Sequence, residues 1–367
     1  SGGGRPSPSR MMSSPRVRTP NWDRPLVAAA GLLCLLSVVA LASACATLNP
    51  SLMTKQAVWI ALGVLISLAA ASGPYTRWID MSLFLYAGAL ALLVVVASAG
   101  TVKLGAARWL TIFGFSLQPS ELAKLATACI LARYLAAQPT PLSVRTLFLS
   151  GMLAGVPALL VFLQPDLGSS SIVVAIWFGM VIVAGISRRH LLMVVAAGAA
   201  LGPLAWHALK DYQRLRLLVF LNPHLDPLGA GYTMIQSQIA IGSGQLLGRG
   251  WFAGTQNHLN FLPERHADFL YSVIGEEWGF AGSVLIVALF GMLVWRVSRI
   301  GSLTPDPQGR LLAAGIVSWI GYQAVINMGM VMGLLPVVGV PLPLVSYGGS
   351  AMVVVWTALG LAQSIHR

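Results

Sequence analysis

The sequence predicts an all-α polytopic membrane protein with about ten transmembrane helices and one long extracytoplasmic loop between spans seven and eight. Its 367 residues are 56% hydrophobic and only 9% charged, against about 25% charged residues in an ordinary soluble domain. The long apolar runs, such as 26–44 and 82–97, do not alternate with polar residues as barrel strands do. Only helices and closed barrels satisfy their backbone within lipid, so helices follow.

Ten segments are long and apolar enough to be candidate spans of about 20 residues. They cover residues 25–46, 56–71, 78–97, 120–136, 147–163, 169–183, 189–209, 269–297, 311–334 and 346–365. The fifth and sixth are short and are separated only by the turn at 164–168. They could instead form a hairpin that does not fully cross, which would change the count by one pair.

The N-terminal residues differ from the rest of the chain. Residues 1–4 (SGGG) have the composition of a tag remnant, and residues 5–24 are polar and rich in Ser, Pro and Arg. This composition predicts a disordered cytoplasmic tail followed by a single transmembrane domain at 25–367. The three cysteines lie in apolar runs without a CxxC pattern, which predicts neither a disulfide nor a metal site.

The basic residues predict the orientation, because short cytoplasmic loops collect Lys and Arg. With the N-terminal tail inside, most short-loop cations fall on the cytoplasmic side and both termini are cytoplasmic. The opposite short loops hold only Lys55, Lys103 and Arg108. The exception is the long outer loop 210–267, whose five cations suggest an anionic ligand. Topology thus explains the net charge of +12, and no nucleic-acid partner is expected.

Charged residues within spans are costly and are therefore candidates for function. Glu121 and Lys124 lie three residues apart at the start of the fourth span, close enough to pair. They are either a structural ion pair or part of a site. Asp166 lies in the 164–168 turn and is either a helix cap or a functional acid.

A cluster of ionisable residues precedes the eighth span. Glu264, Arg265, His266 and Asp268 occupy four of five consecutive positions, and the apolar run begins at Phe269. Asp268 could simply cap the helix. A cap needs no such neighbours, however, whereas a general base is tuned by them. We therefore expect Asp268 to be functional.

Two further interpretations concern the acids near this cluster. His266 and Asp268 alone are a weak zinc site, although Asp268 and a substrate phosphate could hold a hard divalent cation such as magnesium or manganese. Glu276 and Glu277, further into the eighth span, are expected to be structural, with one of them paired to a cation of another span.

The two outer loops have different compositions. Loop 210–267 is rich in glycine and carries Gln236 and Ser237, which suits a segment that folds over a polar ligand. The last outer loop, 337–350, contains prolines and Ser346 but no cation. We expect this last loop to form a rigid wall beside the site.

Five sequence blocks closely resemble the SEDS family (shape, elongation, division and sporulation proteins), and its RodA branch in particular. They are GAARWL at 105–110, QPSELAK at 118–124, QPDLGS at 164–169, the run 216–269 with DPLGAGY and IQSQIAIGSG, and 333–350 with GLLP and SYGGS. The fourth block is the most specific of the five. The similarity extends over nearly everything from Asp23 to Arg367.

The resemblance implies a peptidoglycan glycosyltransferase of the bacterial inner membrane. Such a protein joins lipid II units during cell elongation and works with a class B penicillin-binding protein and other elongation-complex membrane proteins. By the motif match, Asp268 is the essential acid. The family usually has Thr where this chain has Ala267, so no hydroxyl at that position can orient the carboxylate here.

The expected mechanism follows from the chemistry of the donor. Its leaving group is a pyrophosphate, so charge stabilisation by Lys124, Arg108, Arg216 or a divalent cation matters more than a strong acid. Asp268 would deprotonate the acceptor hydroxyl. The residues expected to bind substrate are Arg108, Glu121, Lys124, Asp166, Arg216, Gln236, Ser237, Glu264, His266 and Ser346. A lipid II flippase and a scaffold that activates the penicillin-binding protein are the alternatives.

Overall fold

The structure, a computed structural model, describes residues 22–45, 51–99, 101–103, 106–112, 115–226, 229–259 and 261–367. The expected tag remnant and most of the expected tail lie outside these residues. In the described part of the chain, ten long helices match the ten expected spans. They are α1 (Arg24–Ala44), α2 (Ser51–Ser72), α4 (Ser82–Ala99), α5 (Pro119–Ala136), α6 (Val144–Leu163), α7 (Leu167–Val183), α8 (Arg188–Ala208), α12 (Leu270–Leu303), α13 (Pro307–Val331) and α14 (Gly349–His366).

Length and composition support a membrane-spanning bundle. Helices α1, α2, α6, α12 and α13 are each long and apolar enough to cross a bilayer, and α4 and α7 are apolar but somewhat shorter. A short helix, α3 (Thr76–Asp80), precedes α4 and takes up the beginning of the expected third span. Helices α6 and α7 pack against each other as an antiparallel pair around the 164–168 turn.

Several helices begin where a polar side chain caps them. Asp23 accepts the Leu26 N–H at the start of α1, Ser143 accepts the Thr146 N–H at the start of α6, and Asp306 caps α13. Each of these side chains satisfies one of the four N–H groups that the first turn of a helix leaves unpaired. The capped starts therefore agree with the span boundaries read from hydropathy.

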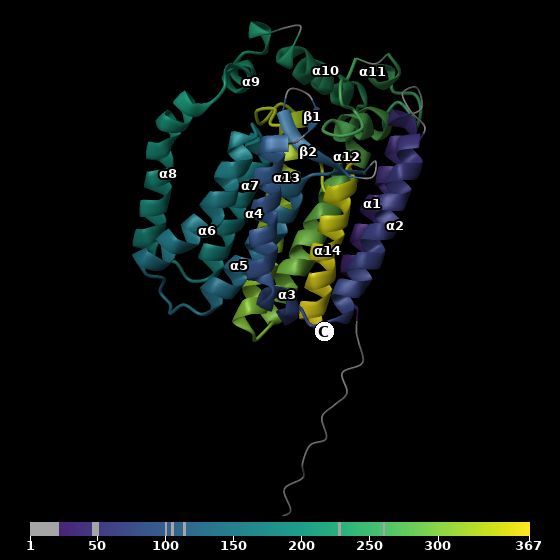
Figure 1. The fold of residues 1–367 in the computed structure, drawn as a ribbon. Coiled ribbons are helices and arrows are strands. Elements are labelled where there is room, and N and C mark those ends of the chain that lie inside the picture. Colours follow the sequence, from purple (N-terminus) through teal and green to yellow (C-terminus); the bar gives the residue numbers. More distant parts are fainter. Residues whose placement is uncertain are drawn as a thin grey trace, which may run out of the picture.

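The core of the bundle is built around α13. This helix packs against α5, α7, α12 and α14, while α1 packs against α12 and α2 against α14. Trp319 of α13 is fully buried. Asp23 and Arg367 lie at one end of the bundle, here called the terminal end, and the segments between α8 and α12 cover the opposite end, here called the loop end (Figure 1).

Helix α8 stands apart from the rest of the bundle. Within the described chain it packs closely against no other element, and all its described side chains are exposed or half-buried. Figure 1 shows it separated from α6 and α7 along most of its length. The seventh span is therefore held mainly by its ends.

The loop end is more ordered than the sequence predicted. A small antiparallel sheet, β1 (Thr101–Lys103), β2 (Ala106–Ile112) and β3 (Phe115–Leu117), lies between α4 and α5. The expected loop 210–267 contains α9 (Asp211–Leu221), the 3-10 turn η1 (Pro223–Leu225), α10 (Ala230–Ser243) and α11 (Thr255–His258). The mainly helical fold class is confirmed, but the sequence did not predict the small sheet at residues 101–117, because strands this short have no clear apolar period to read.

Helix α12 is broken at Gly279, whose φ of 64° lies in the left-handed region. The freed backbone groups pair with the segment 244–250. Arg249 and Gly250 donate to the carbonyls of Glu276 and Glu277, and Phe280 donates to the Gln245 carbonyl at 2.8 Å. A break at membrane depth is tolerated when another segment satisfies the backbone in this way. The outer loop is thereby fastened to the first third of α12.

The two glutamates beside this break have structural contacts. Glu276 is fully buried and accepts from the Thr255 hydroxyl at 3.1 Å and the Gln256 N–H at 3.0 Å. Glu277 accepts from the hydroxyl of Ser43 in α1. The described partners of Glu276 thus come from the outer loop. The expectation was that Glu276 or Glu277 would pair with a cation of another span. Both acids help to hold the loop and α1 against α12.

Candidate active site

Asp268 lies in a turn at the loop end, directly before α12. The N-cap residue of α12 is Phe269, which makes no side-chain capping bond. The Asp268 side chain is half-buried. Asp268 thus precedes the cap position by one residue, and its carboxylate lies where the outer loop and the last outer loop meet.

Asn327 of α13 fixes the backbone at Asp268. This side chain is fully buried, and its Nδ2 donates to the Asp268 carbonyl at 2.9 Å and to the Val340 carbonyl at 2.6 Å. Tyr347 also donates its N–H to the His266 carbonyl at 2.9 Å. The last outer loop is thus fastened to the turn that carries Asp268, which confirms the expected wall beside the site.

The carboxylate of Asp268 and the guanidinium of Arg216 flank Gly339 in this wall. The point where a Cβ on Gly339 would stand is 3.5 Å from Asp268 Oδ2 and 3.8 Å from Arg216 Nη1. Gly339 has a φ of +69°, a conformation that L side chains adopt only with strain. A Cβ at this position would therefore strain the backbone, and it would stand in van der Waals contact with both Asp268 and Arg216.

Helix α9 brings Arg216 to this position. Tyr212 donates its hydroxyl to the Pro165 carbonyl at 3.2 Å, so α9 rests on the turn between α6 and α7. The guanidinium of Arg216 lies 5.8 Å from the centre of the Tyr212 ring. Side chains of α9, the 165–167 turn and residues 337–338 also line a small cavity next to Arg216.

The three neighbours of Asp268 in the ionisable cluster have separate environments. His266 Nε2 lies 3.7 Å from Glu264 Oε2, and the His266 ring stacks at a tilt on Tyr347. Burial lowers the pKa of His266; Glu264 opposes this shift and Arg265 reinforces it. Arg265 is buried and donates to the Ala44 carbonyl at the end of α1, where a cation suits the helix dipole.

Glu121 and Lys124 form the buried ion pair that their spacing predicted. Lys124 Nζ lies 2.7 Å from Glu121 Oε1 and 3.1 Å from Gln323 Oε1 of α13. Gln323 also accepts from Trp319 and donates to the Pro341 carbonyl at 2.9 Å. The pair therefore links α5 to α13 and, through Gln323, to the wall beside Asp268.

Three other expected substrate-binding residues have structural partners. Asp166 caps α7 by accepting the Ser169 N–H at 3.0 Å, which confirms the cap interpretation. Ser237 of α10 is fully buried and donates to the Val331 carbonyl at 2.6 Å. Ser346 accepts the Leu342 N–H at 2.9 Å within the last outer loop. These contacts make the three residues part of the scaffold around the site.

Two expected residues have no described side-chain partner. Gln236 is half-buried on α10. Arg108 belongs to β2 at the loop end, and its side chain lies outside the described atoms. Their roles at the site remain predictions.

The sequence interpretation missed the buried amides of α13. Gln323 and Asn327 are spaced four residues apart, which places them on one face of the helix. Both lie inside an expected span, where polar side chains are rare and mark functional faces. That signal was present in the sequence, but only the charged residues were considered there.

The donors around Asp268 do not form a metal cage. Within the described residues, no group of three or more His, Cys, Asp or Glu side chains lies close enough to hold a metal ion. Magnesium is often held by only one or two carboxylates together with substrate phosphates. A divalent cation at Asp268 therefore stays a prediction, in which the substrate phosphates would supply further ligands. Cys34, Cys45 and Cys129 are buried and free.

A match to a protein-family sequence model shows the family of this chain. The model of the FtsW/RodA/SpoVE cell cycle proteins matches residues 24–367, nearly the whole described chain. The chain belongs to the FtsW/RodA/SpoVE family. The match begins at the first residue of α1.

Other members of the FtsW/RodA/SpoVE family are similar over most of their length. Peptidoglycan glycosyltransferase MrdB of Escherichia coli (strain K12) is 39% identical over 361 residues, which cover 97% of each chain. Peptidoglycan glycosyltransferase RodA of Treponema pallidum (strain Nichols) is 32% identical and covers 85% of this chain and 89% of its own.

Solved structures of the family have the same fold. A chain from a peptidoglycan synthase complex, solved in work on the coordination of polymerization and crosslinking, matches with a TM-score of 0.82 at 35% identity and covers 94% of this chain and 97% of its own. The rod shape determining protein RodA of Thermus thermophilus matches with a TM-score of 0.71 at 30% identity over 94% and 96%.

Proposed function

We propose that this chain is a peptidoglycan glycosyltransferase that polymerises lipid II at the outer face of the cytoplasmic membrane during cell elongation, with Asp268 as general base. Family membership and the MrdB relative carry the reaction class. The observation that supports the residue assignment is the convergence of Asp268 and Arg216 on Gly339. An acid and a fixed cation on one surface suit a reaction that moves a proton from one group and releases an anion.

The proposed step joins two lipid-linked disaccharides. The hydroxyl of the acceptor sugar attacks the anomeric carbon of the donor sugar, the bond to the donor pyrophosphate breaks, and Asp268 takes the hydroxyl proton. General base catalysis of this kind contributes about 10²–10⁴-fold. Arg216 meets the negative charge that develops on the leaving pyrophosphate. The buried amide of Asn327 holds the backbone of the base in place.

Lys124 has a different role in this proposal. Its ammonium is fully buried and contacts Glu121 and Gln323. An ion held inside the bundle cannot also contact a lipid-linked pyrophosphate at the outer surface. We therefore assign the pair to holding α5 against α13, which removes Lys124 from the groups expected to meet the leaving charge. Arg108 remains a candidate for that task.

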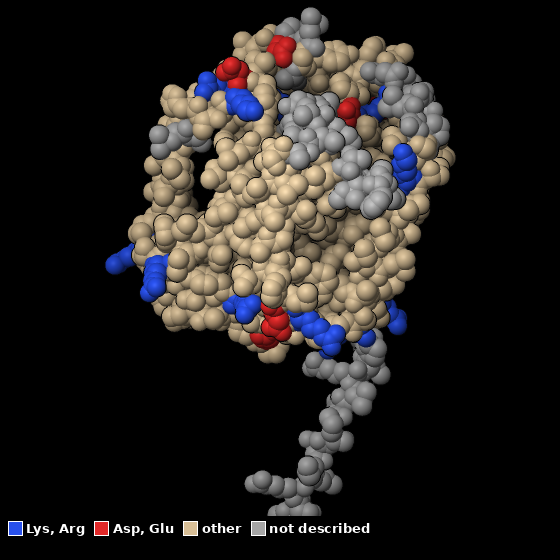
Figure 2. All heavy atoms as spheres, viewed as in Figure 1, with Lys and Arg blue, Asp and Glu red and all other residues tan. Residues whose placement is uncertain are grey.

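The orientation follows from the distribution of basic residues. Figure 2 shows Lys and Arg gathered along the rim of the terminal end. By the bounds of the helices, the basic residues at this end are Arg24, Arg77, Arg133, Arg145, Arg188, Arg189, Arg296, Arg299, Arg310 and Arg367. By the positive-inside rule this end is cytoplasmic, so both termini lie inside and the loop end faces outward. The site then lies where a lipid-linked sugar leaves the outer leaflet.

A class B penicillin-binding protein is the proposed partner. The support is the relative from a peptidoglycan synthase complex that coordinates polymerization and crosslinking. Other membrane proteins of the elongation complex would join this pair. Polymerisation and cross-linking act on the same glycan strand. A stable complex would therefore bring the glycosyltransferase site and the transpeptidase site of the partner within reach of one product.

Purified protein with lipid II and its partner tests the reaction. We expect glycan chains on a gel, and the proposal fails if fluorescent lipid II only changes leaflet in vesicles, as a flippase would make it do. It also fails if neither occurs and the chain only stimulates the partner, as a scaffold would. The same assay with and without a chelator tests the divalent cation: loss of chains that magnesium restores supports a cation at the pyrophosphate.

A further inference from the structure

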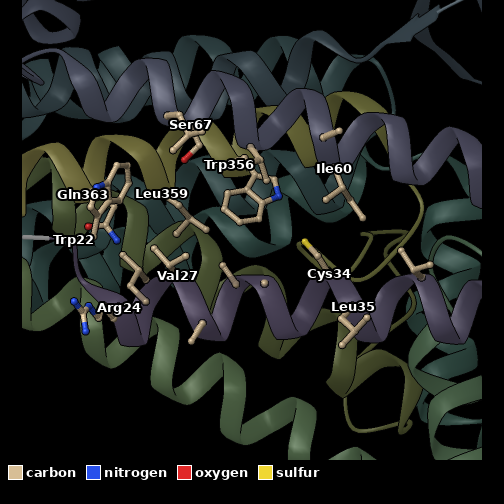
Figure 3. A pocket seen from close by; sticks show the side chains of 18 of the residues that line it. Trp22, Arg24, Val27, Cys34, Leu35, Ile60, Ser67, Trp356, Leu359 and Gln363 are labelled. Atoms are coloured by element: carbon tan, nitrogen blue, oxygen red, sulfur yellow. The ribbon is translucent and has the colours of Figure 1, made fainter.

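A long apolar groove runs along the side of the bundle, away from the proposed active site. It has a volume of about 800 Å³, which is within the range of about 300–1,000 Å³ for ligand pockets. Figure 3 shows α1 and α2 as its two sides, with Trp356 and Leu359 of α14 between them. Nearly all the surface that faces the groove is apolar. Water in the groove would therefore find few hydrogen-bond partners.

The groove exists because its two walls pack on different partners. Helix α1 packs mainly against α12, whereas α2 packs against α14, so the two diverge and expose the floor. Gly31 in the α1 wall has open space where a Cβ would stand, with no atom within 4 Å. At Gly63 in α2, by contrast, the Trp356 ring occupies the space where a Cβ would stand. The space is thus open on the α1 side.

The length of the groove suits one membrane leaflet. Its lining runs along α1 from Arg24 to Val38, which is about 20 Å at the rise of an α-helix. One leaflet of the hydrocarbon core is about 15 Å thick. An acyl chain that enters at the terminal end can therefore lie along the groove for the full depth of its own leaflet.

The terminal end of the groove is basic and aromatic. Arg24 is exposed, and among the described residues it has no ion-pair partner. Arg367 stacks on Trp22, which also lines the groove. The neighbouring acid, Asp23, is buried and already paired with Arg296. The mouth thus presents uncompensated positive charge beside an aromatic ring, which is typical of a headgroup site at a membrane interface.

We propose that this groove binds an anionic phospholipid of the cytoplasmic leaflet, with its phosphate at Arg24 and an acyl chain between α1 and α2. The leaflet follows from the orientation proposed above. The apolar walls and the length of the groove match an acyl chain, and the cationic mouth matches the anionic phosphate. Residues 1–21 precede this mouth in the sequence, but their Ser-, Pro- and Arg-rich composition matches neither the apolar walls nor the positive charge at the mouth.

Two substitutions test the contributions of the apolar walls and of the cationic mouth separately. Gly31→Leu fills the open space, and Gly88→Leu is its matched control, because Gly88 lies on α4 outside the groove and also has no atom within 4 Å of its Cβ position. Arg24→Gln removes the charge at the mouth. Native mass spectrometry of the full-length protein, incubated with phosphatidylglycerol or phosphatidylethanolamine, counts the bound lipid.

We expect wild type and Gly88→Leu to retain phosphatidylglycerol in preference to phosphatidylethanolamine. Arg24→Gln lowers that preference about fivefold, as for one cationic contact to an anionic headgroup, and Gly31→Leu reduces the binding of both lipids. Equal binding of both lipids to all four proteins overturns the proposal. So does a dimer that Gly31→Leu alone dissociates, because the groove would then be an interface between copies. Lipid binding is read without polymerisation, so failure here leaves the proposed reaction untouched.

Discussion

The two ends of the bundle each carry an aspartate directly before a long apolar helix. Asp23, at the terminal end, is 2% exposed. It accepts the Leu26 N–H as a helix cap, and both its oxygens bind the Arg296 guanidinium. Asp268, at the loop end, is half-buried and lies one residue before the N-cap residue Phe269, and its carboxylate flanks Gly339 opposite Arg216.

The difference shows what makes one acid structural and the other available for chemistry. At Asp23, one neighbouring helix supplies a guanidinium and another, α14, supplies Gln363, which binds the Asp23 backbone on both sides. At Asp268 the buried amide of Asn327 binds the backbone carbonyl, and the half-buried carboxylate lies beside Gly339 and Arg216. Position before a helix is the same in both cases, so packing around the acid decides its role.

The largest effect on stability is expected at the terminal end. Asp23→Asn leaves the Arg296 guanidinium without its partner, which costs about 3 kcal/mol of unfolding free energy, as for other broken buried pairs. Thermal or denaturant unfolding in detergent measures this change. Asp268→Asn should unfold like wild type. If both substitutions destabilised the protein equally, the contrast between a structural and a functional acid would be lost.

A smaller effect on stability and a clear effect on rate are expected at Asn327. Asn327→Ala leaves the carbonyls of Asp268 and Val340 without their donor, at about 1–3 kcal/mol. The turn that carries the base then shifts, and we expect the polymerisation rate to fall by about tenfold or more with the lipid II KM little changed. A rate that falls only in proportion to the folded fraction would reduce Asn327 to a stabilising residue.

Much of the fold could be predicted because it depends on local patterns. The ten spans follow from apolar runs, the Asp166 cap from its place before a helix, and the Glu121–Lys124 pair from a spacing of three. Asn327 and Asp268 are 59 residues apart in the sequence, and no local sequence pattern predicts their contact. The positions of Arg216 and Gly339 relative to Asp268 are hidden for the same reason.

Helix α12 shows the same limit with two glycines. Gly279 breaks the helix and meets the backbone of the outer loop on several sides, whereas Gly291 has nothing within 4 Å. Both are single glycines in one apolar run, so the sequence does not distinguish a break from a lipid-facing position. Only the packing of segment 244–250 against the first of them decides the difference.

The smallest expected effect concerns His266. Burial holds its pKa below the ordinary value of 6.5, so below that pH the unfolded chain takes up a proton that the folded protein resists. Stability therefore falls as the pH falls through the range below 6.5. His266→Gln should flatten this slope in melting temperatures measured from pH 7.5 to pH 5. An unchanged slope would place the acid sensitivity at another group.

The central claim is that Asp268 acts as the base, and the kinetics of Asp268→Asn test it most directly. We predict a polymerisation rate about 10²–10⁴-fold below wild type, with lipid II affinity little changed. Asp211→Asn is the matched control, since this acid also belongs to the outer segment but is fully exposed, and it should retain the wild-type rate. Full polymerisation by Asp268→Asn in detergent with a competent partner would contradict the account.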